Sequence, residues 1–153
     1  WKLVGKREMF LPYNAYKLSG NTLKYADLIR PGHLNPDHAR YELHRVWVVE
    51  ATLKSGVSHI YAKRVFYLDE DSWAATVIDK YDTRGQLWRV SEAHSINFVD
   101  VPMYYQTAEV QHDLQSGRYI AMGLRNEEPK VYEVIKRTPG DFTPARLRDL
   151  GTR

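Results

Sequence analysis

The sequence predicts a mainly β protein: a strongly curved antiparallel sheet, or half-barrel, of about seven or eight strands with one or two short helices. Apolar and polar residues alternate over long runs, and this period of two is typical of strands rather than helices. Short clusters of Gly, Asp, Asn, Ser and Pro separate the runs, as turns separate consecutive antiparallel strands. Eleven Tyr and four Trp also favour sheets and binding surfaces.

Length and composition indicate one domain over residues 1–153, long enough to bury a core without disulfides. The net charge of +3 is modest and basic residues are interleaved with acidic ones, so we expect no nucleic-acid partner. Cysteine is absent, which excludes disulfides, thiolate metal sites and a cysteine nucleophile. The chain starts at Trp1 without a signal peptide, and we expect it to be a processed or truncated fragment.

The sequence of the N-terminal region predicts short secondary-structure elements. A strand is expected around residues 7–11, and Pro12 would end it. Residues 22–29 predict a helical turn that begins at Thr22, a suitable N-cap. Residues 30–37 predict a loop, because two Pro, one Gly and one Asn fall within this stretch.

Consecutive strands are predicted for the central region. The first turn, Ser55-Gly56, suits a two-residue hairpin loop because Gly accepts a positive φ. This loop fixes a register in which Trp47 faces Arg64 and Arg45 faces Phe66. The alternating runs that form the four strands are residues 40–53, 58–68, 73–81 and 87–99.

The C-terminal region predicts further strands and one helix. Residues 100–102 break the sheet, and strands follow at residues 103–114 and 118–124. A short strand is expected at residues 131–135. A final helix would begin after Thr143, whose hydroxyl suits an N-cap.

Carried across the central strands, the predicted register collects aromatic and charged side chains on one face, which we expect to be the concave side. It places Asp79 beside Ala62 and Glu92 beside Ala75. A slip by one residue at any turn would exchange the two faces. The candidate ligand-binding residues on this face are Arg45, Trp47, Arg64, Phe66, Trp73, Asp79, Trp88, Glu92 and His94.

Two interpretations of Arg45 and Arg64 remain open. As a binding site, their guanidinium groups would hold a phosphate or carboxylate headgroup while its tail lies along the Trp and Phe rings. As a structural network, Asp79 and Glu92 would neutralise both arginines, and the cost of unpaired buried charge favours this second interpretation.

Neither a metal nor a cofactor is expected. Glu92 and His94 point the same way from one strand, which suits two metal ligands, but no third ligand is evident. The motifs of serine hydrolases, zinc proteases and nucleotide-binding loops are missing, so we expect no catalytic residues and no enzyme activity. Asp79 and Glu92 could form the acid/base pair of a hydrolase, although two nearby arginines would keep both ionised.

Long segments of the chain carry a family resemblance: REMFLPYNAYKL, GHLNPDHARYELHRVWVVEATL, HIYAKRVFYLDEDSW, YDTRGQLWRVSEAH and DLQSGRYIAMGL. They resemble an uncharacterised family of Gram-negative envelope proteins that is labelled outer membrane lipoprotein-sorting-like. The resemblance implies a fold similar to that of periplasmic lipoprotein carriers and receptors, a curved antiparallel sheet around an apolar cavity with helices as a lid. It also implies that this chain, over residues 1–153, is the C-terminal part of a longer secreted precursor. It supplies no established catalytic or binding residues.

We therefore expect a non-enzymatic module in the periplasm or on the periplasmic face of the outer membrane. It would bind a hydrophobic or amphipathic molecule, such as a lipid or a lipoprotein acyl chain, on a concave aromatic sheet face. One alternative is a structural or assembly component of an envelope transport complex, with an envelope transporter or a lipoprotein as partner. Another is a hydrolase that uses Asp79 and Glu92.

Overall fold

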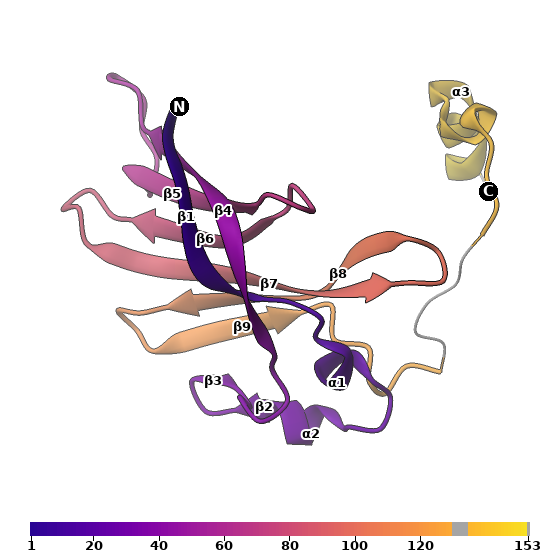
Figure 1. Cartoon of the computed structure of the whole chain (residues 1–153). Helices are drawn as coiled ribbons and strands as arrows, with labels where there is room; N and C mark the ends of the chain where they lie inside the picture. The colour runs from indigo at the N-terminus through magenta and orange to yellow at the C-terminus, as the bar shows by residue number, and fades with distance from the viewer. Residues whose placement is uncertain (130–134, 153) are drawn as a thin grey trace.

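The computed structural model describes residues 1–129 and 135–152, and its main feature is an open antiparallel sheet (Figure 1). The strand order is β1-β4-β5-β6-β7-β8-β9, which confirms the mainly β prediction. None of the described helices is long and apolar enough to span a bilayer. The strands are β1 (Lys2–Pro12), β4 (Tyr41–Thr52), β5 (Lys63–Asp69), β6 (Ala75–Tyr81), β7 (Leu87–Phe98), β8 (Met103–Asp113) and β9 (Arg118–Met122).

Shorter elements lie between β1 and β4 and in the C-terminal region. The expected loop over residues 30–37 contains part of a small hairpin, and the expected helical turn over residues 22–29 forms only at Tyr25–Leu28. The strand predicted at residues 131–135 lies, apart from Ile135, outside the described residues. The shorter elements are α1 (Tyr16–Ser19), α2 (Tyr25–Leu28), β2 (Ile29–Arg30), β3 (His33–Leu34), η1 (Pro139–Phe142) and α3 (Pro144–Gly151).

The C-terminal helix α3 begins where the sequence predicts. The Thr143 hydroxyl oxygen accepts a hydrogen bond from the Arg146 N–H at 3.2 Å. Pro144 occupies the first helical turn, where its missing N–H costs nothing. The N-cap prediction is therefore confirmed.

The first central hairpin has a longer connection than predicted. Ala51, not Trp47, lies opposite Arg64 in the β4–β5 pair. The Leu53 N–H donates to the Ala62 carbonyl at 2.9 Å, so the predicted two-residue loop is wrong. The observed β4–β5 pairing differs from the predicted pairing by an even number of residues. Trp47 and Arg64 therefore still share a face.

The turn between β5 and β6 also differs from the prediction, and this difference changes the face on which later side chains lie. Asp79 lies opposite Val65 instead of Ala62, an odd number of residues further along β5. Side chains alternate along a strand, so an odd displacement moves Asp79, Glu92 and His94 to the other face. The predicted common face is therefore wrong for these three residues.

Local turn chemistry explains this displacement. The Asp69 carboxylate accepts hydrogen bonds from the Ser72 N–H at 2.9 Å and from the Ser72 hydroxyl at 2.6 Å. Trp73 adopts a φ of 58°, so it ends the turn instead of starting a strand. A bulge between Tyr67 and Leu68 adds a further irregularity to β5.

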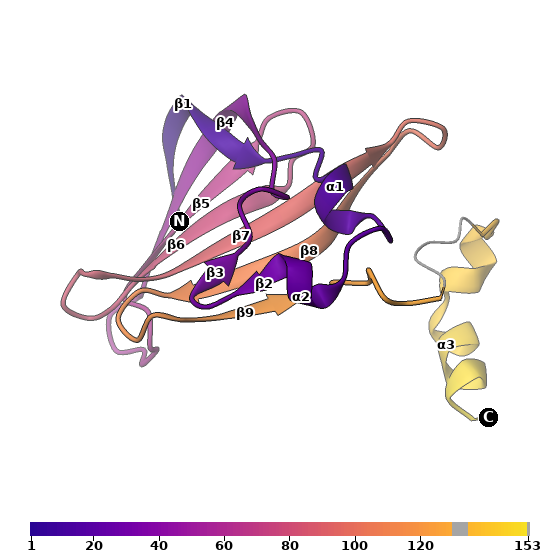
Figure 2. The same ribbon diagram turned by 90° about the horizontal axis from the view of Figure 1, so that it is seen from below.

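One face of the sheet, which we call the inner face, carries the hydrophobic core in two clusters. The other side is called the outer face. In Figure 2, α1, α2 and β3 lie near β7, β8 and β9, consistent with the second cluster. The first cluster, on β1, β4, β5 and β6, consists of Leu11, Val46, Val48, Val65, Tyr67 and Val77. The second consists of Ala15, Leu18, Leu28, Leu34, Ala108 and Val110.

Hydrogen bonds hold the segment between β1 and β4 against β7 and the residues that follow β9. The Ala15 N–H donates to the Ser95 carbonyl on β7 at 2.7 Å. The buried Asn126 side chain donates to the Leu18 carbonyl at 2.9 Å. These bonds hold the segment over β7 and β8, where it forms one wall of a pocket on the inner face.

Candidate functional site

The outer face carries a row of basic side chains that crosses the sheet from β5 to β9. Strand pairing places Arg64 opposite Lys80 and Lys80 opposite Arg89. Asp113 then separates Arg89 from Arg118. We call the four cations of this set the basic row. Like charges on directly opposite residues destabilise a sheet, so the basic row has an energetic cost.

Lys80 lies at the centre of the basic row. Its Nζ donates to Gln111 Oε1 at 2.6 Å and to the Ser91 hydroxyl. Among the described residues, no ion pair includes Lys80 or Arg64. Burial and the positive charges of Arg89 and Arg64 lower the pKa of Lys80. The centre of the row therefore has a surplus of positive charge.

Arg89 has partners of its own. It donates from Nε to Asp113 at 3.0 Å and from Nη1 to the Tyr61 hydroxyl at 3.0 Å. Its guanidinium lies 4.2 Å from the ring centroid of Trp88, whose Nε1–H also donates to Asp113. Hydrogen bonds, led by the Ser116 backbone N–H, lower the pKa of Asp113 to about 2. The predicted residue Trp88 thus orients an arginine at the edge of the outer face.

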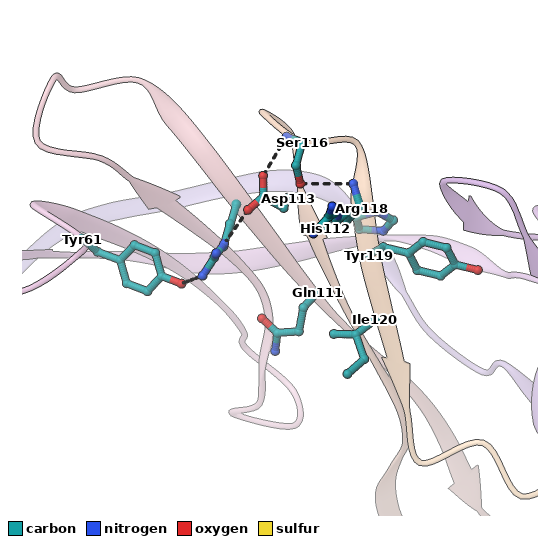
Figure 3. A pocket seen from close by; sticks show the side chains of 9 residues that line it. Tyr61, Gln111, His112, Asp113, Ser116, Arg118, Tyr119 and Ile120 are labelled. Atoms are coloured by element: carbon teal, nitrogen blue, oxygen red, sulfur yellow. Dashed lines mark hydrogen bonds and ion pairs between the residues drawn. The ribbon is translucent and has the colours of Figure 1, made fainter.

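Two open hollows adjoin the basic row. The larger, of about 550 Å³, is lined by Tyr61, Arg89 and Gln111 together with the β8–β9 hairpin (Figure 3). The smaller, of about 240 Å³, is lined by Trp1, Tyr61 and Arg64. Because Tyr61 lines both hollows, they form neighbouring compartments on one surface.

Aromatic rings are exposed beside the smaller hollow. Trp1 packs on Phe66 with ring centroids 5.4 Å apart, and Trp47 stacks with Trp73 at 6.5 Å. We call these rings the aromatic surface. The exposed fractions of Trp1 and Trp73 are 83% and 67%. Contiguous exposed apolar surface of this kind marks an interaction site.

Arg45 also lies on the outer face, but it is already neutralised. Its Nη2 lies 2.6 Å from Glu70 Oε1, and Lys6 Nζ contacts the other oxygen of Glu70 at 2.7 Å. Hydrogen bonds from Arg45 and Lys6 lower the pKa of Glu70 to about 2. Arg45 and Arg64 are not neighbours, because Arg64 pairs with the other end of β4. Arg64 is thus the member of the predicted pair that is available to an anion.

Asp79, Glu92 and His94 lie on the inner face, so the prediction that they share a face with Arg45 and Arg64 is wrong. The odd displacement at the β5–β6 turn is the cause. Within the described residues, neither arginine forms an ion pair with Asp79 or Glu92. The predicted arginine–carboxylate network is therefore also wrong.

The two inner carboxyl groups have separate surroundings. Asp79 accepts a hydrogen bond from the Tyr67 hydroxyl at 2.8 Å. Glu92 accepts from the Tyr41 hydroxyl at 3.2 Å and 3.3 Å, and burial raises the pKa of Glu92. The expectation that arginines keep Glu92 ionised therefore has no structural basis.

A group of potential metal ligands that sequence reasoning missed lies at the β5–β6 turn. Among the described residues, His44, Asp69 and Asp71 place one ligand atom each within 4.8 Å of one another. The residues meet only through β4–β5 pairing, so local spacing gave no signal. Asp69 already accepts from His44 at 2.9 Å and from Ser72, which explains the group as a turn-stabilising cluster.

The fold and the outer face define a mainly β domain with an exposed aromatic and basic surface. The chain belongs to the DUF1329 family, described as proteins of unknown function, because the family model matches residues 1–148. It is 52% identical over 154 residues to a Pseudomonas aeruginosa protein described as uncharacterized protein PA3922. The alignment covers all of this chain and 34% of that relative, so the chain spans about a third of its length.

Two solved structures are similar to part of this chain. A Vibrio parahaemolyticus structure, described as that of a proposed outer membrane lipoprotein-sorting protein domain, is 20% identical with a TM-score of 0.43. A DUF1329 family protein from Desulfovibrio piger is 16% identical with a TM-score of 0.44. Each match covers 51% of this chain, and 33% and 32% of those chains. The match of the family model to residues 1–148 confirms the family resemblance found in the sequence.

Proposed function

We propose that this chain is a non-enzymatic module of the cell envelope that binds an amphipathic molecule with an anionic headgroup on its outer face. The observation that carries the proposal is the adjacency of the aromatic surface and the basic row, joined through the two hollows that share Tyr61. We place the module in the periplasm or on the periplasmic face of the outer membrane. Lipids and acylated proteins of the envelope have the required chemistry.

The aromatic surface would bind the tail and the basic row would bind the headgroup. Each buried CH₂ of the tail contributes about 0.8 kcal/mol. An anion beside Lys80 and Arg64 would offset the repulsion between these cations, which have no carboxylate partner among the described residues. Asp113, the carboxylate within the basic row, is already paired with Arg89.

The expected curvature remains part of the proposal. The described sheet is open, with β1 and β9 at its edges. We propose that the half-barrel is completed in the longer proteins of the family by their additional residues, since this chain spans 34% of the relative from Pseudomonas aeruginosa. The ligand face is then the outer face, which lies opposite the core clusters.

Binding of two single-chain amphipaths with the same tail tests this proposal. We expect dodecyl phosphate to bind at least about tenfold more tightly than dodecyl maltoside, measured by tryptophan fluorescence below micelle concentrations. The double variant Arg64→Gln/Lys80→Gln should remove this preference, and Phe66→Ala should weaken both ligands.

Arg148→Gln on the exposed helix α3 is the matched charge control, and its affinities should equal those of the unaltered protein. Equal binding of the two amphipaths, or a preference that survives loss of Arg64 and Lys80, would contradict the proposed headgroup site. Retained far-UV circular dichroism would show that each variant is folded.

A second candidate is an assembly role, with the aromatic surface as a contact for an envelope transporter or a lipoprotein. The exposed apolar side chains continue beyond the aromatic surface to Leu3, Phe10 and Leu43 on β1 and β4, which favours a broad protein contact. Because β4 and β5 are already paired on both sides, their hydrogen exchange should then be slower still in a full-length family member than in this chain. Protection without any amphipath binding would favour assembly over ligand binding.

A further inference from the structure

The inner face contains a separate pocket of about 370 Å³ between β7, β8 and the segment that precedes β4. Leu34 and Val110 belong to its apolar wall, and Tyr41, Glu92 and His94 are among its polar residues. It lies on the opposite face from the basic row. Apart from His112, which also lines the larger outer hollow, its residues differ from those of the proposed amphipath site. We call it the inner pocket.

Glu92 is the charged group at the polar end of the inner pocket. Strand pairing places it between Val77 and Val110, so two apolar side chains flank it on the sheet. The Tyr41 hydroxyl donates to both carboxylate oxygens, and His112 Nε2 lies 3.8 Å from Oε2. Among the described residues, no lysine or arginine pairs with Glu92. A carboxylate accepts about four hydrogen bonds, so this one retains acceptor capacity.

His94 provides a second and independent observation. Its side chain is 1% exposed, it lines the inner pocket, and its Nδ1 has no hydrogen-bond partner. Burial lowers the pKa of His94 to about 4, so the imidazole is neutral at pH 7. A buried polar atom without a partner is uncommon in native proteins and indicates a missing ligand or water.

From this arrangement we propose that the inner pocket binds a small apolar molecule that carries a protonated amine. The ammonium group would donate to Glu92 and to a nitrogen of His94, while its hydrocarbon part would contact Leu34 and Val110. The Tyr41 ring, which lies edge-on to His94 at 6.0 Å, adds an aromatic contact for a cation. An anionic ligand would meet the Glu92 carboxylate and is excluded.

Three probes with the same hydrocarbon chain test the charge requirement without any mutation. Hexylammonium, hexanol and hexanoate are titrated into the protein at pH 7 by calorimetry. We expect hexylammonium to bind at least about tenfold more tightly than hexanol, and hexanoate not to bind. Equal binding of hexanol, or binding of hexanoate, would overturn the proposal. Failure of all three to bind would also overturn it.

Glu92→Gln tests the residue assignment, because it keeps the shape of the side chain and removes its charge. We expect at least about a tenfold loss of hexylammonium affinity. Glu109→Gln on the same sheet is the matched control and should retain the affinity, because Glu109 is exposed and does not line the pocket. Retained affinity in Glu92→Gln would refute the assignment.

The NMR resonances of the histidine rings provide a readout that distinguishes the inner pocket from the outer site. Hexylammonium should shift the ring signal of His94, which lines the inner pocket, but not that of the exposed His59, which lines the smaller outer hollow. Dodecyl phosphate preference should be unchanged in Glu92→Gln, so that failure of the inner pocket and failure of the outer site are distinguishable. Unshifted His94 signals would contradict binding in the inner pocket.

Discussion

The two faces of the sheet differ in which side chains they bury and which they leave exposed. The inner face buries apolar side chains and the polar side chain of His94, whose Nδ1 lacks a partner, and it half-buries Glu92. The outer face leaves aromatic rings exposed and aligns Arg64, Lys80 and Arg89 beside one another. The inner face thus provides most of the stability, whereas the outer face retains energetic costs that a ligand could relieve.

Matched leucines give the largest expected difference between the faces. Leu11 on the inner face is fully buried, whereas Leu43 on the outer face is 58% exposed. Leu11→Ala should lower the free energy of unfolding by about 2–5 kcal/mol, because it removes buried contacts and leaves a cavity. Leu43→Ala should change it by about 0.5 kcal/mol or less. Urea denaturation measures both, and equal losses would show that the outer face is covered as well.

His94 gives a pH-dependent contrast. Folding lowers the pKa of His94 to about 4, while the unfolded side chain titrates near 6.5. The unfolded state therefore binds more protons between these values, so the contribution of His94 is fully present above pH 6.5 and is lost as pH falls toward 4. In His94→Gln, the decrease in unfolding free energy between pH 7 and 4 should be smaller by up to about 3 kcal/mol.

The exposed outer residue His59 serves as the control for this measurement. His59→Gln should leave the pH dependence of unfolding as it is in the unaltered protein. A His94→Gln variant with the same slope between pH 4 and 7 would show that His94 is protonated in the folded state.

Lys80 gives the smallest expected effect. Lys80→Gln removes a cation from between Arg64 and Arg89 and should raise the unfolding free energy by about 0.5 kcal/mol, after allowance for solvent screening. Added NaCl should stabilise the unaltered protein more than the variant, because salt screens the repulsion. Lys80→Arg keeps the charge and should keep the salt response. A less stable Lys80→Gln at low salt would indicate that its hydrogen bonds outweigh the repulsion.

The sequence predicted the strands well because alternation is a local property. It predicted the shared face of Trp47 and Arg64 despite a wrong loop, since the error covered an even number of residues. It failed at Asp69 and Trp73, where a side-chain hydrogen bond and a positive φ set the turn. Turn geometry of this kind depends on a few atoms, and a single odd displacement moved Asp79, Glu92 and His94 to the other face.

The site was harder to predict than the strands. Glu92 and His94 were recognised as a pair, but the sequence associated them with arginines that lie on the other face. Their contact with Tyr41 joins β4 to β7 across the inner face, and no spacing rule reports such a contact. The basic row escaped notice for the same reason, because it is visible only once the true pairing is known.

The strand order also has a consequence for folding kinetics. From β4 to β9 each strand pairs with its successor, so these hairpins close short loops and can form early. β1 pairs with β4 only after residues 13–40 have been looped out, which carries a larger entropic cost. That looped segment also forms a wall of the inner pocket. We therefore expect the pocket to be among the last parts of the molecule to assemble, and an occupant of it to slow the release of the N-terminal strand.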